Sequence, residues 1–438
     1  MKQHIIVREY ATLKIAKHPQ KQSTRCLDEA EISQQDFDYL YELMHQEVSA
    51  AESQKKIFQI SSRTTLRVQN FVGVIETPAG TVIELLPKIA HLDDLDQLKD
   101  KLLEMILLAQ NIKYRKVDEA SLKSYKGPLN EYLARVFLIE LGALLQKGIR
   151  QDYLNVQDEQ LYLKGKLNLK AHVRNSAGKS HKFPIHHDVL GSNNAENRLL
   201  KTAVEFILKK TRDSHNKKKA LIFSHLMQDI PLSKQLDFDF QKWRSGRLVA
   251  HYKAVKPWCQ LILKQKNPMA IAGEDRGYSL LFPIEKVFEQ YIGHKLKDLL
   301  KDDFSLHMQD NENYLLEKDE KNYCRLKPDF LIKKNKINEL VLDAKWKRLD
   351  ENNKKFGLNE SDVYQMYAYS HTYLQYSKKV VLIYPKQANF TKAIEGLRFL
   401  PNTASGPELW LVPYDLILDQ LCLSEKGKTE IFSQFFNI

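Results

Sequence analysis

The stretch "LKPDFLIKKNKINELVLDAKWK", residues 326–347, decides the fold expected for the C-terminal part of this chain. Two apolar runs flank the polar segment "KKNKIN", and this pattern predicts an antiparallel β-hairpin. Successive side chains of a strand point to opposite faces, so Asp343 and Lys345 are expected on one face of the second strand. The apolar residues that alternate with them, Leu342, Ala344 and Trp346, are expected to face a core.

The polar face of this hairpin carries the chemistry that the sequence predicts. Aspartate is disfavoured in the middle of a strand, and hairpin pairing would place Asp329 beside Asp343. Two neighbouring carboxylates repel each other unless one is protonated or a cation lies between them. Oxygen ligands suit Mg²⁺ (or Mn²⁺), which keeps several waters. With Lys345 to orient a water or neutralise the transition state, these are the parts needed for phosphodiester hydrolysis.

The spacing Asp…Asp-x-Lys is not specific by itself. The same chain repeats it with Asp303, Asp319 and Lys321. That second occurrence lies in "LLEKDEKNY", where we expect no strand, so it is set aside. The context of a motif, rather than its spacing, therefore has to identify the site.

Two expected helices flank the hairpin. The upstream helix, "LFPIEKVFEQYIGHKLKDLL", carries Glu289, with Glu285 one turn earlier as an alternative acid. The downstream helix, "SDVYQMYAYSHTYLQY", carries Gln365 and Tyr369, which lie four residues apart and so share one helical face. This context favours Asp329, Asp343 and Lys345 as the functional set.

Composition bounds the class of protein. The chain of 438 residues is longer than a single hydrophobic core usually supports, so two or three domains are expected. A formal charge of +12 favours a polyanionic partner, although a merely basic surface is the alternative. No apolar run is long enough to span a membrane. The four cysteines form no CxxC pair, which points to a reducing cytoplasm without a zinc or disulfide framework.

Three regions differ in pattern. Residues 1–125 mix strands and helices and are expected to form a small α+β domain. Residues 126–274 are expected to be mostly helical with a β-hairpin. In residues 275–438 strands alternate with helices, which predicts an α/β domain with a mixed central sheet.

Two further segments carry patterns that resemble binding sites. In residues 240–266 the rings of Trp243, Tyr252 and Trp258 alternate with basic residues, a pattern that can bind nucleic acid by stacking. The favoured alternative is an amphipathic helix with a solvated basic face. The segment "AGKS" at 177–180 lacks the first glycine of a phosphate-binding loop. We therefore expect a partner, and not this chain, to hold any nucleotide.

The motifs in this order resemble a known family. Residues 283–385 resemble a PD-(D/E)xK nuclease core of the restriction-endonuclease type, with Gln365 and Tyr369 similar to the QxxxY motif of its RecB-like branch. The wider chain resembles the McrC family, the nuclease subunit of the McrBC modification-dependent restriction system. The stretches that carry this resemblance are "NFVGVIETPAGTVIELLPKI", "LKGKLNL", "NAENRLLK", "VFEQYI", "LKPDF", "VLDAKWK" and "SDVYQMYAYS". Residues 210–270 match the family poorly.

The resemblance implies roles for the site residues. Asp329 and Asp343 would bind the metal and Lys345 would be catalytic. Glu289 would be a further acidic ligand or a supporting carboxylate. Gln365 and Tyr369 would support the site or contact DNA. The alternative is that they are only polar residues on one face of a packed helix, with a structural role.

The resemblance also implies partners. Residues 1–125 would dock into the pore of a ring of McrB-type AAA+ GTPase subunits, which bind GTP and are stimulated by this chain. The chain would then be a Mg²⁺-dependent endonuclease that cleaves modified double-stranded DNA together with that ring in antiphage defence. Two alternatives stay open: a non-enzymatic adaptor with a degenerate nuclease fold, and a stand-alone RecB-like repair nuclease.

Overall fold

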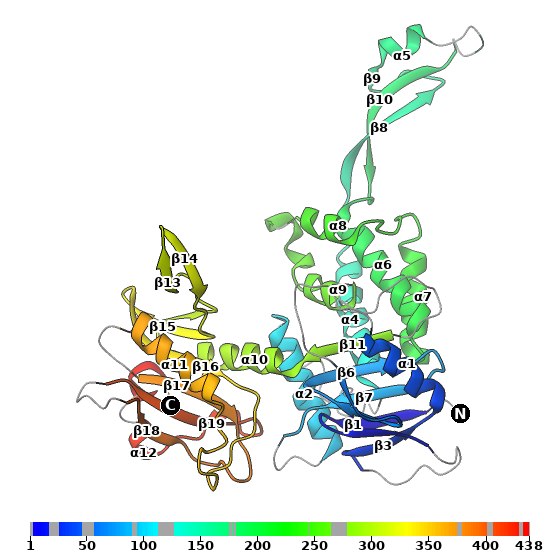
Figure 1. Ribbon diagram of the computed structural model, residues 1–438. Coiled ribbons are helices and arrows are strands. Elements are labelled where there is room, and N and C mark those ends of the chain that lie inside the picture. The colour runs from blue at the N-terminus through cyan, green and yellow to red at the C-terminus, as the bar shows by residue number, and fades with distance from the viewer. Residues whose placement is uncertain are drawn as a thin grey trace. The chain divides into compact units, whose positions relative to one another are not determined.

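A computed structural model (Figure 1) describes twelve parts of the chain. They are residues 3–16, 26–45, 57–89, 94–112, 127–174, 178, 181–244, 246–263, 278–374, 379–400, 406–428 and 432–437. The chain divides into two units, one of residues 1–129 with 266–438 and one of residues 130–265. The boundaries expected at 125/126 and 274/275 lie outside the described residues.

Two four-stranded sheets form the N-terminal part of the first unit. One has the order β1 (His4–Arg8), β7 (Val82–Leu86), β6 (Phe71–Glu76) and β11 (Tyr278–Pro283). The other has the order β3 (Glu29–Ile32), β2 (Thr12–Ile15), β5 (Thr65–Val68) and β4 (Phe58–Ser62). Helices α1 (Gln34–His45) and α2 (Leu95–Ala109) belong to the same part. Strands β6 and β7 form a hairpin around the Pro78–Gly80 turn, and their residues are almost entirely buried.

Strand β11 joins this N-terminal sheet although it lies about 200 residues further along the chain. It pairs antiparallel with β6, from Tyr278 opposite Glu76 to Pro283 opposite Phe71. Gly73 makes this pairing possible, because a Cβ at its φ of 130° would overlap the carbonyl oxygen of Leu280. The region expected to begin the third domain thus contributes a strand to the N-terminal sheet.

The second unit is mostly helical. Its helices are α4 (Leu129–Gln146), α6 (Ala195–Lys210), α7 (Ser214–Leu226), α8 (Leu236–Lys242), η2 (Arg247–Tyr252) and α9 (Lys256–Leu263). The side chain of Asn194 caps α6 by accepting from the Asn197 N–H. The rings of Trp243, Tyr252 and Trp258 are 6%, 0% and 4% exposed, so they belong to the core and cannot stack on bases.

A long arm extends from the helices of this unit (Figure 1). It consists of β8 (Asp152–Gln160) and β10 (Phe183–Gly191), paired antiparallel, with the short strand β9 (Lys166–Leu167) and helix α5 (Leu169–Val173). Of the segment "AGKS", only Gly178 lies among the described residues.

The C-terminal part of the first unit is built on a mixed sheet. Its order is β12 (Ser305–Met308), β15 (Phe330–Lys334), β16 (Ile337–Ala344), β17 (Lys379–Pro385), β19 (Glu408–Asp415) and β18 (Ile394–Arg398), with β20 (Gln420–Leu421) on β19. The pairs β16–β17 and β17–β19 are parallel and the others antiparallel. Helices α10 (Ile284–Leu299), α11 (Glu360–Tyr373), α12 (Glu425–Gly427) and α13 (Ser433–Phe435) accompany it. The expected mixed α/β, multidomain class is confirmed.

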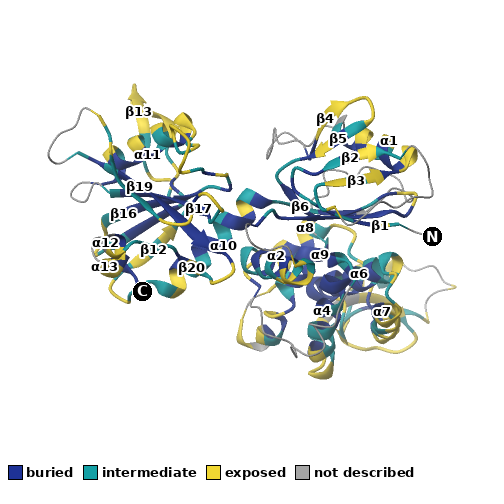
Figure 2. Ribbon diagram, turned by 90° about the horizontal axis from the view of Figure 1, so that it is seen from below, coloured by how far each residue is buried: buried dark blue, intermediate teal, exposed yellow. Residues whose placement is uncertain are grey.

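The expectation of no strand in "LLEKDEKNY" is wrong. Strands β13 (Tyr314–Lys318) and β14 (Lys321–Arg325) form a two-stranded hairpin there. Asp319 and Glu320 make its turn, with φ of 51° and 60°. Both strands are exposed, so neither shows the apolar alternation by which a half-buried strand is recognised. Figure 2 shows the yellow, exposed β13 beside the largely buried strands of the mixed sheet.

Among the described residues, no helix has the length and apolar character needed to cross a lipid bilayer.

Candidate active site

The hairpin of residues 326–347 forms as its pattern predicts. Strands β15 and β16 pair antiparallel with Phe330 opposite Leu342. Asn335 and Lys336 make the two-residue turn, with φ of 49° and 69°. Leu342, Ala344 and Trp346 are all buried, at 0%, 7% and 5% exposure. The alternation therefore predicted the apolar face correctly, while the face of Asp343 is also buried, together with Val341.

Asp329 and Asp343 meet at the end of this hairpin. Asp329 lies one residue before β15, and its Oδ2 accepts a hydrogen bond of 2.9 Å from the backbone N–H of Ala344. Asp343 is fully buried, and its Oδ2 lies 2.6 Å from Nζ of Lys345. That oxygen has no partner with hydrogen-bond geometry in the described part of the chain. The two carboxylates are thus held at adjacent positions by the backbone of one hairpin.

The electrostatics of these groups reflect burial and mutual repulsion. Burial raises the pKa of Asp329 well above its ordinary value, and the charges of Asp343 and Glu289 raise it further. Burial likewise raises the pKa of Asp343 and of Glu289. For Lys345, burial favours the neutral form, but the carboxylate of Asp343 outweighs it and the pKa is raised. Lys345 is therefore a cation at neutral pH.

Glu289 reaches the site from helix α10. Its Oε1 accepts a hydrogen bond of 2.6 Å from Nε2 of Gln309. The backbone N–H of Gln309 in turn donates to the carbonyl of Asp329, at 2.9 Å. Glu285, the alternative acid, instead accepts from Nδ2 of Asn70 in the N-terminal part. The structure thus brings Glu289, and not Glu285, to the two aspartates.

Gln309 is a residue of the site that sequence reasoning missed. It follows β12, has a φ of 53° and bridges Glu289 and Asp329. No motif marks it, because its role depends on the packing of β12 against β15. Its one local signal is the turn that ends β12.

Helix α11 holds the ammonium group of Lys345 through Gln365. Nζ of Lys345 donates to Oε1 of Gln365 at 3.2 Å, and Nε2 of Gln365 donates to the hydroxyl of Tyr369 at 2.8 Å. That hydroxyl donates to the carbonyl of Lys327 at 2.8 Å. A chain of hydrogen bonds thus runs from the lysine to the segment that precedes Asp329. Tyr369 is 2% exposed, so it lies within the core and not on the surface.

The residues fit a divalent cation held by few protein ligands. The described residues contain no group of three or more His, Cys, Asp or Glu side chains arranged to hold a metal. Asp329 and Asp343 supply two carboxylates, and the buried Oδ2 of Asp343 already lies beside a cationic group, the ammonium of Lys345. Mg²⁺ is commonly bound by one or two carboxylates and completes its octahedron with water and substrate. The donor set therefore suits Mg²⁺.

The segment after β1 contacts the segment after β16, which carries Lys345 and Trp346. Both carboxylate oxygens of Glu9, next to β1, lie 2.9 Å from Nε1 of Trp346, which donates to them. The backbone N–H of Lys88 donates to the same carboxylate at 2.9 Å. The Trp346 ring packs edge-on against Phe288, the neighbour of Glu289, at 5.2 Å between centroids.

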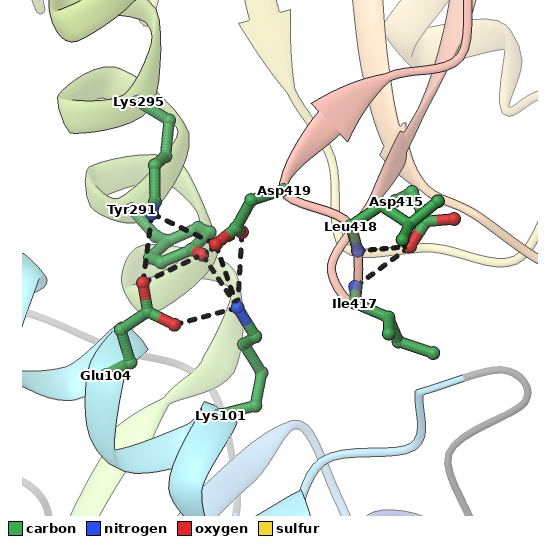
Figure 3. A network of polar contacts seen from close by, with 8 residues as sticks. All are labelled: Lys101, Glu104, Tyr291, Lys295, Asp415, Ile417, Leu418 and Asp419. Atoms are coloured by element: carbon green, nitrogen blue, oxygen red, sulfur yellow. Dashed lines mark hydrogen bonds and ion pairs between the residues drawn. The ribbon is translucent and has the colours of Figure 1, made fainter. Parts of the chain in front are cut away.

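A second polar network joins α2, α10 and the turn before β20 (Figure 3). The ammonium groups of Lys101 and Lys295 lie between the carboxylates of Glu104 and Asp419, at 2.7–3.2 Å. The buried hydroxyl of Tyr291 donates to Asp419. The helix that carries Glu289 is therefore tied to the N-terminal part by charge pairs as well as by packing.

Known proteins match both the sequence and this fold. Residues 66–385 match the family described as McrBC 5-methylcytosine restriction system component. The chain belongs to this family, which confirms the membership expected from the motifs. No curated protein matches it by sequence.

Two solved structures from Thermococcus gammatolerans resemble the chain. One is the half-complex from a tetradecameric assembly of McrB AAA+ hexamers with bound McrC. The match is 18% identical, has a TM-score of 0.67 and covers 98% of this chain and 96% of that one. The other, the cryo-EM structure of the McrBC complex, matches with 18% identity and a TM-score of 0.49, over 66% of this chain and 85% of that one. The first likeness shows that the two chains share a fold.

Proposed function

We propose that this chain is a McrC-type, Mg²⁺-dependent DNA endonuclease with a PD-(D/E)xK core. One observation carries the proposal: a single hairpin holds the carboxylates of Asp329 and Asp343 beside each other, with the ammonium group of Lys345 2.6 Å from Asp343. The mixed sheet with its helices α10 and α11 gives that hairpin the surroundings expected of such a core. Membership of a restriction-system family supports DNA as the substrate.

Each side chain of the site would have a separate role in phosphodiester hydrolysis. Asp329 and Asp343 would hold the cation. When bound, Mg²⁺ supplies positive charge that stabilises a phosphoryl oxygen in the transition state and makes a water more acidic. Lys345 lies 2.6 Å from Asp343, where its ammonium group would orient the attacking water or offset negative charge in the transition state. Gln365 fixes the direction in which its ammonium group points.

We further propose that a McrB-type AAA+ ring binds GTP, drives translocation and selects modified DNA. The family supports this, as does the fold shared with a structure of McrB hexamers with bound McrC. The arm of the second unit exposes many large apolar side chains, which commonly mark protein contacts. They are Tyr153, Leu161, Tyr162, Leu163, Leu169, Val173, Val189 and Leu190. We place a contact with the ring on this arm, and docking through residues 1–125 stays a prediction.

The test compares wild type with Lys345→Ala in the presence of the McrB-type GTPase, methylated DNA, Mg²⁺ and GTP. We expect cleavage by the wild type alone and equal stimulation of GTP hydrolysis by both. Lys355→Ala is the matched control, because Lys355 is an exposed lysine ten residues away that pairs with the exposed Glu360.

Each other outcome selects another function. Cleavage that survives in Lys345→Ala contradicts the assigned site. Cleavage by the isolated wild-type chain, without the GTPase, favours a stand-alone nuclease. Stimulated GTP hydrolysis with no cleavage by any variant favours the adaptor.

A further inference from the structure

The hairpin β13–β14 has two chemically different faces. Its register pairs Tyr314 with Arg325, Leu316 with Tyr323 and Lys318 with Lys321. Residues opposite each other share a face, as do alternate residues of one strand. These three pairs therefore form one face, which we call the basic face, and it carries three cations, two tyrosines and no carboxylate. Cys324, with a φ of 55°, interrupts the ladder, but the pairs on both sides of it keep one register.

The acidic residues of the hairpin lie elsewhere. Glu317, opposite Asn322, lies on the other face. Asp319 and Glu320 form the turn beyond the last pair. Neither Lys318 nor Lys321 is paired with a carboxylate in the described part of the chain, so both charges are available to a partner.

The basic face is exposed. All five residues of β14 are exposed, and the apolar groups Leu316 and Tyr323 are 57% and 47% exposed. The guanidinium of Arg325 lies over the ring of Tyr314, 5.1 Å from its centroid, and its Nε donates to the Tyr314 hydroxyl at 3.0 Å. Its Nη2 donates to the same hydroxyl, so Arg325 is held against Tyr314 although the residue is exposed.

The base of the hairpin is fixed to the candidate active site. The backbone N–H of Leu326 donates to the carbonyl of Asn313 at 2.9 Å, which closes the hairpin. The Leu326 carbonyl accepts from the Tyr373 hydroxyl at 3.1 Å, and the next carbonyl, that of Lys327, accepts from Tyr369. Asp329 follows two residues later. Helix α11 therefore holds both the hairpin and the site, so a ligand on one lies close to the other.

We propose that the basic face of β13–β14 binds the sugar–phosphate backbone of duplex DNA beside the bond to be cleaved. Lys318, Lys321 and Arg325 contact phosphates, and Leu316 and Tyr323 lie against sugars. From Lys321 to Arg325 the strand advances about 13 Å, or about four base-pair steps along a duplex. Such contacts position DNA without reading its sequence. This inference rests on the proposed nuclease function, because it takes that enzyme's substrate as the ligand.

The test measures binding of a fluorescent 20-base-pair duplex by anisotropy at several salt concentrations. The full-length chain carries Lys345→Ala, so that DNA is not cut. The variant adds Lys318→Gln and Lys321→Gln. The control instead adds Lys217→Gln and Lys218→Gln, exposed lysines on helix α7 that change the net charge equally. Thermal unfolding of each protein checks that it is folded.

We expect the hairpin variant to bind roughly ten- to a hundredfold more weakly at 0.1 M salt than the control. The slope of log affinity against log salt should fall in magnitude by about 2, because each lost phosphate contact removes about 0.9. Equal affinity and slope in the variant and the control would overturn the inference, and so would loss of binding to the GTPase ring with DNA binding intact.

Failure of this inference is distinguishable from failure of the proposed function. If Lys345→Ala abolishes cleavage and the hairpin variant binds like the control, only the assignment of the basic face is wrong. If the chain without hairpin substitutions binds no duplex, the assignment of the basic face is wrong. If cleavage survives in Lys345→Ala, the proposed function is wrong, whatever the binding measurements show.

Discussion

Glu9→Gln should make the stability of the first unit less dependent on pH. Glu9 is 2% exposed, and its carboxylate accepts hydrogen bonds from Trp346 and from the backbone of Lys88. Burial raises its pKa from the ordinary 4.5 to about 7, and these hydrogen bonds only partly oppose the rise. A glutamine keeps the size of the side chain and an oxygen that accepts from the same donors, but it never ionises.

The sign and size of the effect follow from the two pKa values. Below pH 4.5 Glu9 is protonated in both the folded and the unfolded chain, so it does not change the free energy of unfolding as pH varies. Between pH 4.5 and about 7 the unfolded chain ionises first, so stability falls as pH rises. Above pH 7 the free energy of unfolding has fallen by its full amount, about 3 kcal/mol. This figure follows because each unit of difference between the two pKa values corresponds to about 1.4 kcal/mol. Glu9→Gln removes this loss.

The assay is thermal unfolding of the full chain from pH 5 to pH 8.5. We expect Glu9→Gln to unfold at a temperature close to that of wild type at pH 5 and at a clearly higher one at pH 8. The control Glu42→Gln changes an exposed carboxylate on α1 and should follow the wild-type profile. Parallel profiles for wild type and Glu9→Gln would refute the reasoning.

Three further predictions concern the site and its support. Mg²⁺ should raise the unfolding temperature of wild type but not of Asp343→Asn, because a ligand stabilises only the state that binds it; an equal rise in both would contradict the metal site. Tyr369→Phe removes two hydrogen bonds and should slow cleavage and lower stability by about 1 kcal/mol, whereas Tyr364→Phe, at a side chain 68% exposed, should change neither. Gly293→Ala would place a Cβ 2.5 Å from Cε of Met308, and this overpacking should lower stability by about 1–3 kcal/mol in a melt.

The elements that the sequence predicted are those with a local signal. The hairpin of residues 326–347 has period-2 alternation next to a core, so the apolar face of β16 followed from the order of residues. Helix α6 has an apolar stripe and a capping Asn194. The hairpin β13–β14 was missed because its strands are exposed and its turn, Asp319-Glu320, lacks the glycine or asparagine usual at positive φ.

The candidate site was predicted in part for the same reason. Asp329, Asp343 and Lys345 lie within one hairpin, so their proximity needs only strand pairing. Glu289 could not be separated from Glu285 in the sequence, because both lie on the same helix one turn apart. Only the tertiary contacts of α10 decide that Asn70 engages Glu285 and that Gln309 holds Glu289 at the site.

By itself the sequence determined the amphipathic hairpin, its carboxylate face and the family to which the chain belongs. These depend on residues close together along the chain. Only the tertiary structure decided that β11 completes the N-terminal sheet, and that Glu9 holds Trp346 across 337 positions. The physical reason is that a contact between distant residues is made by the packing of whole elements, and it leaves no periodicity or spacing at either residue. The link between the segment after β1 and the segment of Lys345 therefore became visible only in the folded chain.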